Sequence, residues 1–224
     1  MKYDDIVVLI PTLDPKERLI EVINKLNNNG FKNIVIVDDG SSNKNNIKKI
    51  KNVKILVHDI NKGKGAALKT GFNYINKLNA KGVITLDDDL QQDIEDIKKI
   101  CDLFLDNQGV YFGVRLFENA PFIRKYSNKI TSIIFKKLYK EKIIDTQTGL
   151  RLFPIHMLKE LLKISGKGFE YEMNVLKYLA LNKISINQII IKTIYFKEKN
   201  DSHYKAFKDS LLIYKELFRR NYYD

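Results

Sequence analysis

Two apolar segments that end in carboxylates constrain the fold of this chain more than any other feature. Residues 34–37 read Ile-Val-Ile-Val and lead into Asp-Asp-Gly-Ser-Ser, and residues 83–86 read Val-Ile-Thr-Leu and lead into Asp-Asp-Asp-Leu-Gln. Short apolar runs that stop at polar turn residues are typical of buried strands. Ligands of open α/β sheets bind outside the carboxyl edge of the strands. The two acidic strand ends therefore predict a shared site at that edge.

The triple aspartate has the composition of a site for a hard cation. On a strand that continues through residue 87, Asp87 and Asp89 share one face about 7 Å apart, while Asp88 points to the other face. Like charges at that distance raise each other's pKa unless a metal neutralises them. The two carboxylates and the amide oxygen of Gln91 suit Mg²⁺ or Mn²⁺, which favour oxygen ligands.

Each acidic junction also has a plain structural interpretation. Asp89 or Asp93 is suited to cap the helix that follows, and the Asp-Gly-Ser-Ser run at residues 39–42 is good turn chemistry. One such junction would be ordinary. Two junctions with a Gly63-Lys64-Gly65 loop between them favour a shared site, and this loop also offers backbone N–H groups and positive charge to an anion.

The composition limits the class of protein. A chain of 224 residues suits one domain, and its single cysteine excludes an intrachain disulfide. No apolar run is long enough for a signal segment or a membrane span, so we expect a cytoplasmic protein. The formal charge of +12 favours an anionic partner: a nucleotide, a nucleic acid or an acidic membrane surface. His58, His156 and His203 are isolated in the sequence and support no zinc site.

The order of predicted elements indicates an α/β fold. Strands are predicted at 6–10, 34–37, 53–57, 83–87 and 110–114, alternating with helices from Leu19 to Gly30, at 64–79 and at 93–106. This alternation predicts a mostly parallel central sheet flanked by helices. Basic amphipathic helices are predicted at 121–142 and 205–221. They suit the surface of a bilayer, and the alternative is ordinary domain helices with solvated lysines.

Six short motifs follow one another along nearly the whole chain: Val8–Asp14, Val37–Ser42, Asn61–Ala67, Asp87–Gln91, Asp145–Arg151 and Gly168–Glu172. In this order they resemble glycosyltransferase family 2, of GT-A fold, and especially its branch of dolichyl-phosphate and other polyprenyl-phosphate sugar synthases. The first five are similar to the family's I-P-T-x-N-E, V-D-D-G-S-S, N-x-G-x-G-x-A, D-A-D-L-Q and D-x-x-T-G-x-R elements. Two departures stand out: Asp14-Pro15 replaces Asn-Glu, and Asp88 replaces a small residue.

The resemblance implies a single catalytic domain over residues 1–224. It implies a metal-dependent, inverting transfer of a sugar from a nucleoside diphosphate sugar to a polyprenyl phosphate, at the cytoplasmic face of a membrane. The metal ligands would be Asp87, Asp89 and Gln91, with Mg²⁺ or Mn²⁺ as cofactor. Asp89 and Arg151 would act in catalysis, and the donor would be framed by Pro11, Thr12, Asp14, Asp38, Asp39, Lys64, Asp87 and Asp88.

The acceptor decides what other groups are needed. A phosphate acceptor is already anionic, so Arg115, Arg124 and Arg151 are candidates to contact phosphate oxygens. If the acceptor is instead a glycan or glycolipid hydroxyl, Glu170 or Glu172 would remove its proton. A transferase that binds nucleotide without turnover is a further alternative, and so is a basic nucleic-acid-binding domain. We expect an anionic membrane surface and no nucleic acid as partner, and the sequence makes no prediction of the oligomeric state.

Overall fold

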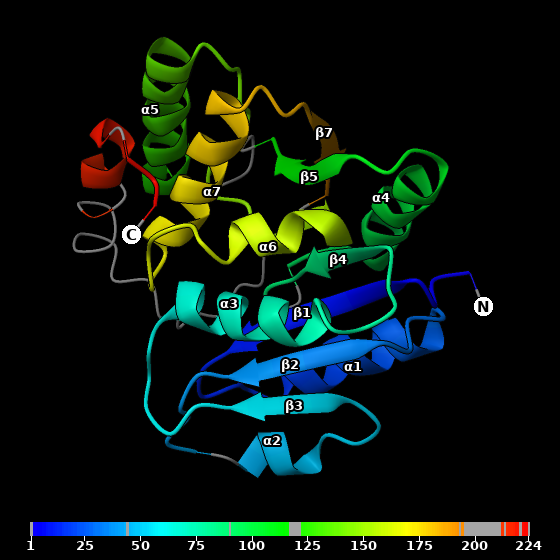
Figure 1. Ribbon diagram of the computed structural model, residues 1–224. Coiled ribbons are helices and arrows are strands. Elements are labelled where there is room, and N and C mark those ends of the chain that lie inside the picture. Colours follow the sequence, from blue (N-terminus) through cyan, green and yellow to red (C-terminus); the bar gives the residue numbers. More distant parts are fainter. Residues whose placement is uncertain are drawn as a thin grey trace.

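The computed structural model describes residues 2–43, 45–89, 91–116, 122–192, 194, 212, 214–219 and 221–223, with side chains described from residue 126 onward in the helix that begins at Phe122. Its centre is a seven-stranded sheet in the order β3-β2-β1-β4-β6-β5-β7 (Figure 1). The strands are β1 (Ile6–Thr12), β2 (Ile34–Asp38), β3 (Lys54–Val57), β4 (Gly82–Thr85), β5 (Val110–Arg115), β6 (Arg151–Pro154) and β7 (Ile186–Ile191).

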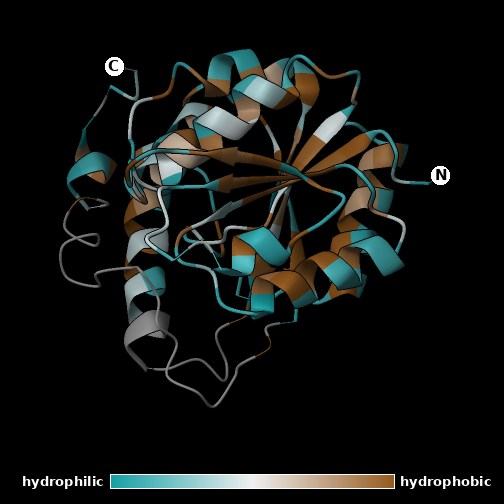
Figure 2. Ribbon diagram, turned by 90° about the horizontal axis from the view of Figure 1, so that it is seen from below, coloured by the Kyte–Doolittle hydropathy of each residue, from teal (hydrophilic) through white to brown (hydrophobic). Residues whose placement is uncertain are grey.

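The helices of the described residues form a layer on each face of the sheet. They are α1 (Arg18–Asn28), α2 (Asn45–Lys49), α3 (Lys64–Ile75), α4 (Ile94–Asp106), α5 (Phe122–Tyr139), α6 (Leu158–Leu161) and α7 (Glu170–Leu181), with a 3-10 turn at Ile155–Met157. The helices α3, α5, α6 and α7 share one hydrophobic core, and α1, α2 and α4 share the other. Figure 2 shows hydrophobic strands enclosed between helices with hydrophilic outer turns.

The alternation of strand side chains explains why both faces are covered. Val7 and Leu9 of β1 lie in the core under α3, while Ile6, Val8 and Ile10 lie in the core under α1. A strand whose two faces are both buried reads as a continuous apolar run, which is the pattern of parallel sheets. The predicted fold class is therefore confirmed: the four pairs β1–β2, β1–β4, β2–β3 and β5–β7 are parallel.

The antiparallel strand β6 was not predicted from the sequence. It inserts between β4 and β5 and is antiparallel to both. Its four residues, Arg151–Pro154, are too short for a periodic signal and end in a proline. The insertion carries the loop before Arg151 to the carboxyl edge of β4.

Several predicted boundaries were wrong by a few residues. The strand predicted at 83–87 ends at Thr85, and the helix predicted at 64–79 ends at Ile75. The helix predicted at 205–221 lies mostly outside the described residues, of which 214–218 are helical and contribute the buried Leu217. No helix in the described part of the chain has the length and hydrophobicity needed to cross a membrane.

Candidate functional site

The two acidic strand ends meet at one edge of the sheet, as the sequence predicted. Thr12 ends β1, and in the strand register it faces Asp38 at the end of β2. The Thr12 hydroxyl donates a hydrogen bond to Asp88 in the loop after β4. Since β1 lies between β2 and β4, Thr12 joins both acidic segments. Pro11 precedes it in the same strand end.

Asp39 holds the loop that leads into α3. Its carboxylate accepts hydrogen bonds from the backbone N–H groups of Lys62 (3.0 Å) and Gly63 (2.7 Å). Nδ1 of the buried His58 lies 2.6 Å from Asp39 Oδ1, and Nε2 of His58 lies 2.8 Å from Thr70 Oγ1 of α3. The Gly63-Lys64-Gly65 loop was predicted to present its backbone N–H groups to an external anion. This was wrong for Gly63, because the Asp39 carboxylate already accepts its N–H.

Asp38 has a different environment. Its Oδ1 accepts hydrogen bonds from the backbone N–H of Ser41 (3.0 Å) and from the Ser41 hydroxyl. Its Oδ2 is buried and has no hydrogen-bond partner among the described residues. Buried polar atoms are almost always hydrogen-bonded in native proteins, so an unpaired carboxylate oxygen is unusual at this position.

Asp14 stabilises the turn after β2. Its Oδ1 accepts hydrogen bonds at 2.9 Å from the Ser42 hydroxyl and from the backbone N–H of Asn43. Its own N–H donates to Ser41 Oγ at 2.7 Å, and its φ of 45° lies in the left-handed region, where aspartate is among the tolerated residues. The carboxylate that departs from the family pattern thus orders the Asp38 loop.

A lysine connects the acidic loop after β4 with α7. Nζ of Lys64, the first residue of α3, lies 2.8 Å from Asp87 Oδ1 and 3.1 Å from Glu172 Oε2. Burial alone would lower the pKa of Lys64, but the two carboxylates outweigh it and hold that pKa above its usual value. Burial alone would raise the pKa of Asp87, but the charge of Lys64 lowers it instead. Lys64 and Asp87 therefore stabilise each other's charged forms.

Asp89 carries an uncompensated charge beside that triad. Burial, together with the carboxylates of Asp87 and Asp88, raises the pKa of Asp89 to about 6. Its Oδ1 accepts a hydrogen bond from the backbone N–H of Gln91 at 3.0 Å, and the helix cap is Asp93, which accepts from the N–H of Glu95. Among the described residues no group of three or more His, Cys, Asp or Glu side chains is arranged to hold a metal ion.

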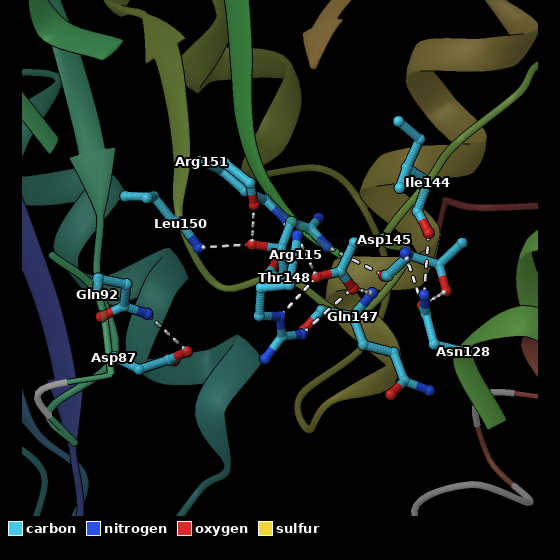
Figure 3. Close-up of polar contacts among 12 residues, drawn as sticks. Asp87, Gln92, Arg115, Asn128, Ile144, Asp145, Gln147, Thr148, Leu150 and Arg151 are labelled. Atoms are coloured by element: carbon cyan, nitrogen blue, oxygen red, sulfur yellow. Dashed lines mark hydrogen bonds and ion pairs between the residues drawn. The ribbon is translucent and has the colours of Figure 1, made fainter. Parts of the chain in front are cut away.

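The loop before β6 forms a wall beside Asp87. A Cβ atom at Gly149 would lie 2.6 Å from Asp87 Oδ1, so this position has room only for glycine while Asp87 keeps its place. The loop is fixed by Arg115 at the end of β5, whose guanidinium donates to Asp145 (2.6 and 3.2 Å) and to the carbonyl of Gln147 (3.2 Å). Figure 3 shows the Arg115 side chain reaching Asp145 on this loop. It also shows Asp87, which accepts a hydrogen bond from the Gln92 amide at 3.3 Å.

Arg151 is buried and lies away from any open surface. Its guanidinium donates to the carbonyl oxygens of Thr148 (2.8 Å), Glu172 (2.8 Å) and Thr146 (3.4 Å), and it stacks over the ring of Phe112. Burial lowers its pKa. These contacts argue against the predicted role of Arg151 as a phosphate ligand. They connect the loop of Gly149 to the first turn of α7 instead.

The two candidate glutamates are placed differently. Glu170 accepts hydrogen bonds at 2.9 Å from the N–H groups of Lys167 and Gly168, so it caps the turn before α7. Glu172 is buried and points to Lys64. The side chain of Arg124, a predicted phosphate contact, lies outside the described residues, as does His203.

Sequence reasoning missed His58 and Gly149 as parts of the site. An isolated histidine carries no spacing signal, and its contact with Asp39 depends on the pairing of β3 with β2. Gly149 belongs to the Asp145–Arg151 motif, but its contact with Asp87 arises only because β6 lies next to β4.

Comparisons with known proteins identify relatives of this chain. A family model described as Glycosyl transferase family 2 matches residues 7–162. The UDP-N-acetylglucosamine–dolichyl-phosphate N-acetylglucosaminyltransferase of Methanococcus voltae is 32% identical over 216 residues, which cover 85% of this chain and 86% of that protein. Glycosyltransferase AglJ of Haloferax volcanii is 24% identical over 225 residues, covering 97% and 72%.

The fold is shared with a solved structure of low sequence similarity. Glucosyl-3-phosphoglycerate synthase from Mycobacterium tuberculosis, in complex with Mn²⁺, UDP and glucosyl-3-phosphoglycerate, superimposes with a TM-score of 0.73 at 13% identity. The match covers 96% of this chain and 79% of that chain.

Proposed function

We propose, from the premise that this chain belongs to glycosyltransferase family 2, that it moves a sugar from a nucleoside diphosphate sugar to a polyprenyl phosphate. The observation that carries the proposal is the convergence of Asp38, Asp87, Lys64 and Glu172 on one edge of the sheet. Such an edge offers an unpaired acceptor, carboxylates for a cation and a positive charge. Nucleoside diphosphates need these three features.

The donor nucleoside would bind at the β2 end of the edge. Asp38 Oδ2 is buried and unpaired among the described residues, so it would accept a hydrogen bond from the base or ribose. Asp39 and Asp14 would act indirectly, because their carboxylates already fix the loops on either side. Pro11 and Thr12 would form the floor between nucleoside and diphosphate.

The diphosphate would lie at the β4 end with one divalent cation, Mg²⁺ or Mn²⁺. Asp87 and Asp89 would hold that cation, with Gln91 next to them. Two carboxylates fit as a partial ligand set, because a diphosphate supplies the oxygens that complete the coordination. The bound cation would neutralise the leaving diphosphate as a Lewis acid. Arg115, through Asp145 and Gln147, and Arg151, through Thr148, would keep the wall next to Asp87 in position.

The proposed acceptor is a polyprenyl phosphate because a relative of 32% identity is named for dolichyl phosphate. A phosphate oxygen is ionised at neutral pH and attacks without a strong base. The structure suits such an acceptor, since the Glu172 carboxylate is already paired with Lys64. One in-line attack on the sugar carbon would invert its configuration, in keeping with the family resemblance.

The outer face of α5 suits a membrane that presents such an acceptor. Four large apolar side chains are exposed on it, and four exposed lysines lie beside them: Tyr126, Ile130, Ile133 and Leu138 with Lys129, Lys136, Lys137 and Lys140. Apolar anchors flanked by lysines bind an anionic bilayer surface, where each lysine contributes about 1 kcal/mol. The proposed location is therefore the cytoplasmic face of a membrane.

The transfer itself is tested with labelled nucleotide sugars. Purified protein with Mn²⁺ and a polyprenyl-phosphate-containing lipid extract should produce a lipid-linked sugar that mild acid releases, since phosphosugar bonds are acid-labile. Asp89→Asn is the inactive control. A labelled product that resists mild acid would point to a hydroxyl acceptor instead, and absence of any product across the common nucleotide sugars would contradict the proposal.

The membrane surface is tested separately by vesicle sedimentation. The double variant Lys136→Glu and Lys137→Glu should weaken binding to anionic vesicles by at least about tenfold. The matched control is the double variant Lys48→Glu and Lys51→Glu, which makes the same change in net charge. These two lysines are exposed near α2, at the opposite end of the sheet (Figure 1). Equal loss in both double variants would mean that net charge alone, not the α5 face, causes binding.

A further inference from the structure

Lys64 occupies a fixed position between the carboxylates of the site. The N–H of Gly63 is held by Asp39, and the N–H of Ala66 donates to the carbonyl of Lys167 at 2.9 Å. A Cβ atom at Gly65 would lie 2.5 Å from Cβ of Tyr171, so the start of α3 packs directly against the turn before α7. The backbone of Lys64 is therefore clamped from two sides, and its ammonium reaches Asp87 and Glu172 without help from a ligand.

The ammonium is enclosed by the groups that it joins. The exposed fractions of the side chains are 17% for Lys64, 31% for Asp87 and 11% for Glu172. The ring of Phe169 lies 5.7 Å from Nζ. Removing the lysine would leave the carboxylates of Asp87 and Glu172 close together with no cation between them, an arrangement that a divalent cation stabilises.

The Asp87 carboxylate is thus occupied before any substrate binds. One oxygen contacts Lys64 at 2.8 Å, the other accepts from Gln92 at 3.3 Å, and Gly149 closes the remaining side. A metal ion that arrives alone has to compete with this ammonium for Asp87. A metal ion that arrives with a diphosphate meets less competition, because the phosphate oxygens offer the ammonium another partner.

We propose that Lys64 is a built-in cation that keeps the metal ligand Asp87 occupied until a nucleoside diphosphate binds, so that free metal binds weakly and metal and nucleotide bind together. This inference rests on the proposed function and adds an order to its binding steps. Lys64 acts here as a positioning and gating residue, first paired with Asp87 and then with the diphosphate, while Glu172 keeps one end of the ammonium anchored.

The proposal is tested by measuring Mn²⁺ binding with electron paramagnetic resonance, which requires no turnover. Without nucleotide, Lys64→Gln should bind Mn²⁺ at least about tenfold more tightly than the wild type, because two carboxylates lose their competing cation. The matched control is Lys62→Gln. Lys62 is exposed and lies two residues before Lys64, so this variant removes one positive charge nearby without touching the Asp87 carboxylate. Equal Mn²⁺ affinity in the wild type and Lys64→Gln, or equal gains in both variants, would overturn the proposal.

A second measurement uses the wild-type protein alone, in case the variant does not fold. Saturating UDP should tighten Mn²⁺ binding by at least about tenfold, and by reciprocity Mn²⁺ should tighten UDP binding equally. Mn²⁺ that binds as tightly without UDP as with it would contradict the gating role of Lys64. If the wild type binds neither UDP nor other nucleoside diphosphates with Mn²⁺ present, the proposed function fails, and the Mn²⁺ affinities of the lysine variants still decide whether Lys64 competes with metal.

Discussion

The two acidic strand ends of this sheet look alike in sequence but differ in how their charges are stabilised. At the end of β2, Asp39 is held by two backbone N–H groups and by His58, and Asp38 by Ser41. At the end of β4, Asp87 is held by the charge of Lys64, and Asp89 faces two other carboxylates.

The difference suggests two roles: the β2 end is a rigid scaffold, and the β4 end is where we propose that the chemistry takes place. Neutral backbone donors cannot leave, so the β2 end is a fixed frame for one face of a ligand. Lys64 and Asp87 would exchange partners in the proposed binding step, so the β4 end is the part of the site that would respond to a metal and a diphosphate. Each of the following substitutions acts on one side of this comparison.

The largest effect is expected from Asp89→Asn. The variant should lose about 10³-fold in transfer rate, or ~4 kcal/mol of transition-state stabilisation, because it removes a ligand of the proposed cation. Its free energy of unfolding should not fall, since the change removes a repelled charge. The matched control, Asp93→Asn, keeps the cap of α4 and should keep activity. Transfer at the wild-type rate in Asp89→Asn would contradict the assignment of the β4 end to chemistry.

Asp39→Ala should chiefly affect stability. Hydrogen bonds to a charged group contribute about 1.5–3 kcal/mol each. The substitution removes the acceptor of the Lys62 N–H and the partner of His58 Nδ1, and it leaves the Gly63 N–H only Asn61 Oδ1, so we expect a loss of ~3 kcal/mol. Urea unfolding measures it, with Asp59→Ala at an exposed position as control. If Asp39→Ala lowers the free energy of unfolding no more than Asp59→Ala does, the β2 end is not a scaffold.

Gly149→Ala tests the wall that positions Asp87. The new Cβ meets only the end of the Asp87 side chain, so the fold should be retained while the carboxylate moves away from Lys64. A displacement of this size costs about 10²-fold in rate. Gly109→Ala, where the nearest atom is the end of the Asn187 side chain at 3.0 Å, is the control. A crystal structure of Gly149→Ala with an unmoved Asp87–Lys64 pair would remove this interpretation.

A last effect is expected on the pH dependence of stability. The folded protein binds more protons at Asp89 than the unfolded chain does, because its pKa rises from 3.8 to about 6 on folding. The contribution of Asp89 to stability is therefore present below pH 4 and lost as the pH rises through about 6. When unfolding is measured in EDTA, the free energy of unfolding of Asp89→Asn should rise relative to that of the wild type as the pH increases from 4 to 7. A constant difference across that range would show that Asp89 is not repelled by its neighbours.

Much of the fold was predictable because its signals are local. The apolar runs of β1 and β2, the helical spacing of α1 and α4, and the polar residues that end each strand all depend on neighbours within a few positions. The strand β6 was missed because it is only four residues long, and its place depends on pairing with β4 and β5.

The sequence predicted which residues belong to the candidate site better than it predicted how they contact one another. Asp38, Asp87 and Lys64 were expected near the donor, and Glu172 was expected as the base for a hydroxyl acceptor. In the structure Lys64 joins Asp87 to Glu172. Arg151 was expected to contact a phosphate, yet it is buried against backbone carbonyls. A guanidinium in a motif signals an acceptor nearby, and only packing shows whether that acceptor is a ligand or the protein itself.

The sequence by itself determined that two apolar strands deliver carboxylates to one edge of an α/β sheet, because strand alternation and turn chemistry are written in adjacent residues. Only the tertiary structure decided which carboxylate is held by backbone and which by a cation. Lys64, Asp87 and Glu172 are far apart along the chain, and their contact exists because α3 and α7 pack on the same face of the sheet. Electrostatic pairing depends on distance in space, which residue order does not contain.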